Sequence, residues 1–204
     1  TNTPCASIVK LNTSTNAITW QQTYKGTAVS NYAYPRAVCA DSNENTYTIG
    51  HVQANVNGLS GYHTFIIKHN SAGVRQWTRM LDFVVSGSAR ANYGKDISVD
   101  AAGEFIYVGI WLLTNVGPQV PVALKLATDG TGTGSTATSG TITTVHYYDG
   151  ATHMVSGFNG NAGSLSVQEG YMNDSSTDYL GITSTGLPQT NTTPTPPTLN
   201  LEGV

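Results

Sequence analysis

The sequence repeats itself at a nearly constant interval, and this repeat limits the folds open to the chain more than any other feature. Three short apolar stretches carry a lysine at the same place, and these lysines are evenly spaced at Lys10, Lys68 and Lys125. Each stretch is followed by a turn, and Trp20 and Trp77 recur at the same interval in the strands after the first two turns. Tandem units of this length are typical of proteins in which each unit buries its surface against its neighbours.

A second pair of landmarks keeps the same period. Asp41 and Asp100 are separated by almost the interval between the lysines, and so are Gly50 and Gly109. We interpret the repeated aspartates as turn residues that bond to backbone amides, with a ligand contact made once per unit as the alternative. The third copies of several landmarks arrive late, and a Gly/Thr/Ser-rich insertion over Thr131–Gly140 explains most of the delay.

Between these landmarks the chain reads as short strands separated by turns. Runs of β-branched and aromatic residues alternate with Gly, Asn, Asp and Ser, and sustained helical spacing of apolar residues is nearly absent. The pattern predicts an all-β fold. The expected strands are Ala6–Leu11, Ala17–Tyr24, Arg36–Ala40, Thr46–Val52, Thr64–His69, Arg75–Leu81, Asp96–Val99, Phe105–Leu112, Pro121–Leu126, Thr141–Tyr148, Gly163–Val167 and Tyr179–Thr183.

Each period contains four expected strands, which is typical of the blades of a β-propeller. The fold class we predict is therefore an all-β, β-propeller-like array of four-stranded antiparallel blades. About three blades' worth is present: a half blade (5–26), two blades (34–83 and 94–150) and a half blade (163–185). Propellers have four to eight blades as a rule, so we expect the chain to be part of a larger or oligomeric propeller. The Pro/Thr-rich stretch 187–204 is expected to be an extended tail, either disordered or an arm on a neighbouring subunit.

The repeat resembles a known family. Bacterial β-propeller repeats of the SBBP type read roughly D-x-x-G-N-x-Y-V-x-G, then D-A-F-V-x-K-L-N-x-x-G, then a strand with Trp. The matching residues in one unit are Asp41, Tyr47, Gly50, Phe65, Ile67, Lys68, Asn70, Gly73 and Trp77. Those in the next unit are Asp100, Gly103, Tyr107, Gly109, Lys125, Asp129 and Gly130. The resemblance covers about residues 5–185 and implies a β-propeller fold.

The charge and the lengths of the apolar runs argue against nucleic acid and membrane as partners. Only 10% of the residues are charged and the net charge is −3, against about 25% charged residues in an average domain. All nine lysines and arginines lie at or before Lys125 without forming a cluster, so we expect no nucleic-acid partner. No apolar run approaches the ~20 residues of a membrane helix, so we expect no membrane insertion. The first residues lack the features of a signal peptide, which suggests a processed chain or a piece of a longer one.

No combination of residues indicates catalysis or a bound metal. The histidines show no HxH or HExxH spacing, and they are His51, His63, His69, His146 and His153. Cys5 and Cys39 lack the close spacing of a zinc site; we favour buried free thiols, and a disulfide stays open. We therefore expect no cofactor, no metal and no enzyme activity, although an active site assembled only in the fold is not visible in a sequence.

These observations favour a non-enzymatic structural or adhesive component of a larger extracellular or virion assembly, phage-like in composition. Its expected partners are other protein subunits, including copies of itself. One alternative is a carbohydrate-binding propeller, in which Trp111 is the candidate ligand-binding residue because it departs from the repeat. Such a module would bind a surface glycan. The other alternative is a fragment of a secreted propeller hydrolase or lyase.

Overall fold

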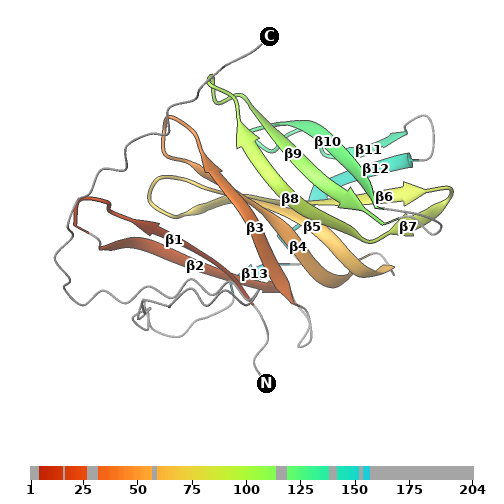
Figure 1. The fold of residues 1–204 in the computed structure, drawn as a ribbon, viewed down its shortest axis with the longest axis horizontal. Helices are drawn as coiled ribbons and strands as arrows, with labels where there is room; N and C mark the ends of the chain where they lie inside the picture. The colour runs from red at the N-terminus through yellow and green to blue at the C-terminus, as the bar shows by residue number, and fades with distance from the viewer. Residues whose placement is uncertain are drawn as a thin grey trace, which may run out of the picture. The chain divides into compact units, whose positions relative to one another are not determined.

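The computed structural model describes residues 5–15, 17–26, 32–56, 59–113, 119–137, 142–151 and 154–156 (Figure 1). Every regular element in these ranges is a β-strand, and the strands form three antiparallel sheets. The predicted all-β class is confirmed. No helix long and apolar enough to cross a membrane occurs in this part of the chain. The expected strands Gly163–Val167 and Tyr179–Thr183 and the tail 187–204 lie outside the described residues.

The middle sheet begins with four strands that pair in chain order: β3 (Ala33–Ala40), β4 (Thr46–Val56), β5 (Leu59–His69) and β6 (Arg75–Val85). Consecutive antiparallel pairing follows from the short turns between them. The short strand β7 (Ser88–Arg90) folds back onto β6 through a turn in which Ser86 and Gly87 both have positive φ.

Two smaller sheets are built from the remaining landmarks of the repeat. The first contains β1 (Ala6–Leu11), β2 (Ile18–Gly26) and β13 (Met154–Ser156), in the order β1-β2-β13. The second contains β8 (Asn92–Val99), β9 (Phe105–Leu112) and β10 (Val120–Ala127), in the order β10-β9-β8. The three lysine-bearing strands are thus β1, β5 and β10, one in each sheet.

The strand after β10 departs from the expected pairing. We expected the last strand of the 94–150 unit to complete the sheet of β8, β9 and β10. Instead β12 (Ile142–Asp149) pairs with β6, and β11 (Gly134–Ala137) pairs with β12. Side chains favour this partner, because Tyr148 donates a hydrogen bond to Asp82 of β6 (2.7 Å) and Arg79 lies 3.5 Å from Asp149. The Thr131–Gly140 insertion adds chain length between β10 and β12, which pair in different sheets.

Two apolar clusters hold the described sheets together. One joins the β1-β2-β13 sheet to one face of the middle sheet and contains Trp20, Tyr24, Phe65, Ile67 and Met80 among others. The other joins the opposite face of the middle sheet to β8 and β9, and its members include Tyr47, Ile49, Ile66, Ile106 and Ile110. Neighbouring strands therefore cover both faces of the middle sheet. Burying one such side chain stabilises the fold by about 1.5–3 kcal/mol.

Candidate functional site

The repeated lysine and tryptophan make the first of two equivalent contacts between sheets. Trp20 of β2 donates its indole N–H to the carbonyl oxygen of Ser71 (3.1 Å), in the turn between β5 and β6. Lys10 of β1 donates to the same carbonyl oxygen (3.4 Å), and the Gln22 amide donates to the carbonyl of Gly73 (3.1 Å). One turn of the middle sheet is therefore held by three side chains of the preceding sheet.

The same contact recurs one period later in the chain. Trp77 of β6 donates its indole N–H to the carbonyl of Thr128 (3.1 Å), in the turn after β10. Lys68 donates to the same oxygen (3.0 Å), and Arg79 donates to the carbonyl of Gly130 (2.8 Å). The repeated Lys and Trp positions in the sequence thus correspond to a repeated contact, in which side chains of one unit donate hydrogen bonds to turn carbonyls of the next.

Two glycines make these contacts possible. Gly73 has φ +80°, and a Cβ added there would lie 2.5 Å from Cγ of Trp20. Gly130 has φ +75°, and its added Cβ would lie 3.0 Å from Cδ2 of Trp77. Each indole therefore packs directly on the backbone of the next unit's turn, at a position that favours glycine for its conformation as well as for its size.

The repeated Asp and Gly positions lie in turns and beside bulges. The Asp41 carboxylate accepts the backbone N–H groups of residues 43 and 45, both at 2.9 Å, and Asp100 accepts those of residues 104 and 105 at 2.8 and 3.2 Å. Gly50 pairs with Pro35 at a bulge in β3, and a Cβ at Gly50 would meet backbone at 2.1 Å. Gly109 pairs with Asp96 at the corresponding bulge in β8.

A tyrosine stands opposite the repeated lysine in two units, and its exposure differs between them. Tyr47 pairs with Lys68 and Tyr107 pairs with Lys125 in the same antiparallel register. Tyr47 is 0% exposed because the next sheet covers it, whereas Tyr107 is 45% exposed. The covered face of the middle sheet thus has an exposed equivalent on β9.

The candidate ligand residue Trp111 lies on that exposed face. It is two pleats from Tyr107 on β9, so both side chains point to the same side, and it is 47% exposed. The Lys95 ammonium lies 4.2 Å from the centre of the Trp111 ring, and Lys125 lies 3.6 Å from that of Phe105. The outer face of β9 is therefore a stripe of aromatic rings flanked by two cations. We call Phe105, Tyr107 and Trp111 the aromatic stripe.

A group of rings around His51 was not foreseen from the sequence. The His51 ring lies 5.1 Å from Tyr34, 5.4 Å from Tyr62 and 5.0 Å from Tyr93, between ring centres. Burial lowers the pKa of His51 to about 4, and the nearby charges of Arg36 and Lys95 add to this. A signal existed, because Tyr34-x-Arg36 recurs as Tyr93-x-Lys95 at the interval that separates the repeated aspartates.

His63 and His69 are enclosed in packing, whereas His146 on β12 is half-buried and His153 lies outside the described residues. His63 bonds to the carboxylate of Asp82, whose other oxygen accepts the Tyr148 hydroxyl, and both His63 and Asp82 are buried. The Tyr24 hydroxyl and Nε2 of His69 share a 2.6 Å hydrogen bond, and burial lowers the pKa of His69 to about 4. Within the described ranges no three His, Cys, Asp or Glu residues come together as a metal site.

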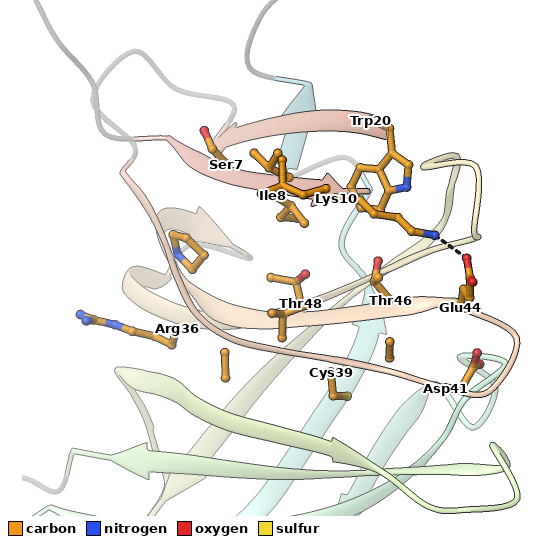
Figure 2. A pocket seen from close by; sticks show the side chains of 16 residues that line it. Ser7, Ile8, Lys10, Trp20, Arg36, Cys39, Asp41, Glu44, Thr46 and Thr48 are labelled. Atoms are coloured by element: carbon orange, nitrogen blue, oxygen red, sulfur yellow. Dashed lines mark hydrogen bonds and ion pairs between the residues drawn. The ribbon is translucent and has the colours of Figure 1, made fainter. Parts of the chain in front are cut away.

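A cavity of about 660 Å³ lies between β1 and the β3–β4 hairpin (Figure 2). Figure 2 shows Lys10 and Trp20 at one end of it, with the Lys10 ammonium bonded to Glu44 at 2.6 Å. The β3 wall is largely apolar and includes Val38, which is 59% exposed. Cys39 also borders the cavity as a half-buried free thiol, and burial together with the charges of two nearby aspartates raises its pKa to about 11.

Neither a protein-family model nor a curated protein matches this sequence. The features that bear on function are therefore the repeated contact, the aromatic stripe and the cavity.

Proposed function

We propose that the protein is a non-enzymatic, β-propeller-like repeat component of a larger extracellular or virion assembly, in which its units stack on other protein subunits. The observation that carries this proposal is the contrast between two equivalent tyrosines. Tyr47 is covered by the next unit of the chain, and Tyr107 is 45% exposed at the same position one unit later.

The exposed face has the composition of an interface. Aromatic side chains are enriched in protein interfaces, while scattered single apolar residues are ordinary surface features. Here three aromatic residues follow one another along one face of a single strand, with two lysines beside them. Covering one such ring gains about 1.5–3 kcal/mol, and the same chain already buries the corresponding face of its middle sheet.

The native mass of the full chain tests the proposal. We expect light scattering after size exclusion to give a mass of several chains, and the Trp111→Asp and Tyr107→Asp variants to shift it towards one chain. Val74→Asp is the matched control, because Val74 is 57% exposed and lies in the β5–β6 turn rather than on β9. A mass of one chain at every concentration, unchanged by these variants, would contradict the proposal.

Carbohydrate binding at Trp111 is the second candidate, and one observation favours it. An exposed indole with a cation beside it suits stacking on a sugar that carries an acidic group, and Lys95 stands 4.2 Å from this ring. A glycan array would show retention of acidic glycans by the full chain and its loss in Trp111→Ala. Retention that survives in Trp111→Ala would place any sugar site elsewhere. For the hydrolase or lyase alternative, the described residues offer the Asp82–His63 pair, and both of its side chains are buried.

A further inference from the structure

Two cationic side chains occupy equivalent positions in successive units. Arg36 lies in β3, two residues after Tyr34. Lys95 lies in β8, two residues after Tyr93. Each cation is the extra residue of a β-bulge, because the pairing with the following strand passes over it. A bulge changes the direction of a side chain and is frequent beside binding sites, so the repeat points one cation per unit out of the regular sheet.

A cluster of aromatic rings joins the two bulges. The His51 ring lies between them, 5.1 Å from the ring centre of Tyr34 and 5.0 Å from that of Tyr93. The Arg36 guanidinium carbon lies 6.0 Å from the ring centre of Tyr34. The Lys95 ammonium lies 5.7 Å from the ring centre of Tyr93. The middle sheet and the sheet of β8 thus each contribute one cation and one tyrosine to a common site, which we call the paired-cation site.

The two cations of this site lie near enough to repel each other. Burial lowers the pKa of Lys95, and the charge of Arg36 lowers it further. Both charges also add to burial in lowering the pKa of His51. The ion pairs of the described residues are formed by other cations. Holding two like charges together costs free energy, and an anion bound between them would remove that cost.

The rings around the two cations favour an anion that is carried on a sugar. Trp111 stands opposite Tyr93 in the pairing of β8 with β9, and the Lys95 ammonium lies 4.2 Å from its ring centre. Tyr62 lies 5.2 Å from Tyr93 between ring centres. Indole and phenol rings combine apolar faces with hydrogen-bonding groups, which suits the C–H faces and hydroxyls of a sugar. A guanidinium binds an oxyanion through two parallel N–H···O bonds.

A single-stranded nucleic acid fits this site less well. Such a ligand is followed along its backbone by a positively charged groove. Only 10% of the residues of this chain are charged, and the paired-cation site contributes two positive charges. A glycan needs no continuous row of cations, because its rings can bear their acidic groups at intervals.

We propose that Arg36 and Lys95 together bind an acidic group of a glycan, a carboxylate or a sulfate, whose sugar rings lie against Tyr34, Tyr93 and Trp111. Figure 2 shows Arg36 at the far end of the cavity from Lys10 and Trp20, so this site is separate from the repeated contact between units. The inference rests on the carbohydrate alternative of the proposed function, to which it adds a cation and a tyrosine from a second unit.

Binding of labelled oligosaccharides to the full chain tests the site. The probes are a hexamer of galacturonic acid, the methyl ester of the same hexamer, and a heparin hexasaccharide. We expect both acidic probes to bind, more weakly as salt is added, and the ester not to bind, because it keeps the sugar rings and loses the charges. Arg36→Gln and Lys95→Gln should each weaken binding of the acidic probes by about 10- to 100-fold, as expected for a lost hydrogen bond between charged groups.

Lys125→Gln is the matched control. It removes the same charge from another cation that lies over a ring, 3.6 Å from the centre of Phe105. An equal loss of binding in this control would overturn the site, because net charge alone would then explain the attraction. An oligothymidylate of equal charge that binds as tightly as the acidic hexamers would overturn the glycan as ligand.

Two further outcomes separate this inference from the proposed function. Binding that is lost in Trp111→Ala but unchanged in Arg36→Gln would confine the sugar site to Trp111 and refute the pairing of the two cations. An assembly by mass that binds none of the acidic probes would refute the glycan site and leave the structural role in place. Arg36 is exposed, so we expect Arg36→Gln to keep the urea midpoint of the parent chain.

Discussion

Replacing Gly73 by alanine tests the contact by which the first unit grips the second. An added Cβ would lie 2.5 Å from Cγ of Trp20, and the backbone there has φ +80°. Gly87 offers a matched control, because it has φ +77° and an added Cβ would meet nothing within 4 Å. The two substitutions therefore share the backbone strain and differ in the collision with the indole.

The expected magnitudes follow from these two terms. An alanine in the left-handed region costs about 1–2 kcal/mol, and this is the whole expected effect of Gly87→Ala. Gly73→Ala adds the displacement of a buried indole, and overpacking of this kind costs about 1–3 kcal/mol. We expect the free energy of unfolding to fall by about 2–5 kcal/mol in Gly73→Ala.

Urea unfolding followed by tryptophan fluorescence measures both variants. We expect Gly73→Ala also to shift the native emission to longer wavelength, because Trp20 is buried in the folded protein and would be pushed towards solvent. Equal destabilisation by the two variants, with an unchanged native spectrum, would refute the reasoning, since Trp20 could not then pack on the Gly73 backbone.

Three further predictions concern charge and pH. Lys68→Met should destabilise the protein by about 1.5–3 kcal/mol, because the Lys68 ammonium donates a hydrogen bond to a turn carbonyl. Lys125→Met should cost ~1 kcal/mol or less, because Lys125 loses only its contact with the Phe105 ring. Equal effects of the two variants in urea unfolding would contradict the repeated contact. The free energy of unfolding should fall as the pH is lowered from 6.5 towards 4. The reason is that His51 and His69 become protonated in this range in the unfolded chain, while burial holds both pKa values at about 4 in the folded protein. Each histidine lowers the free energy of unfolding by up to ~1.4 kcal/mol per pH unit. His51→Gln should make the pH dependence shallower, and an unchanged slope would count against it. The Cys39 thiol, with its pKa near 11, should react slowly with iodoacetamide at pH 8 in a Cys5→Ser background, and fast reaction would show that it is not held in the neutral form.

The positions of most strands could be predicted from the sequence, because apolar alternation and turn residues are local signals. The bounds of β1 and β9 match the expected Ala6–Leu11 and Phe105–Leu112. β5 begins earlier than expected, at Leu59. Residues such as Gly61 are poor strand formers, so the sequence does not predict a strand there, but pairing with β4 holds them extended. The short strands β7, β11 and β13 were missed, since three or four residues carry too little pattern.

The candidate site could likewise be predicted only in part. The repeated Lys and Trp positions were visible as a pattern, but their acceptors are the backbone carbonyls of Ser71 and Thr128, which no side-chain pattern reveals. Strand partners were also hidden, because the sequence of β12 suits a strand without specifying β6 as its neighbour. The packing of Tyr93 against His51 depends on how two sheets meet, which only the fold determines.

The pairing of β12 with β6 has a mechanical consequence. In a simple stack of repeats each unit can unfold while its neighbours stay intact. Here a strand from beyond β10 is hydrogen-bonded along β6 from Val85 to Arg79, so detaching the unit of β8, β9 and β10 also pulls on the edge of the middle sheet. Separating these units therefore requires breaking the backbone hydrogen bonds between β12 and β6. The middle sheet and the unit of β8, β9 and β10 should therefore unfold together rather than one after the other.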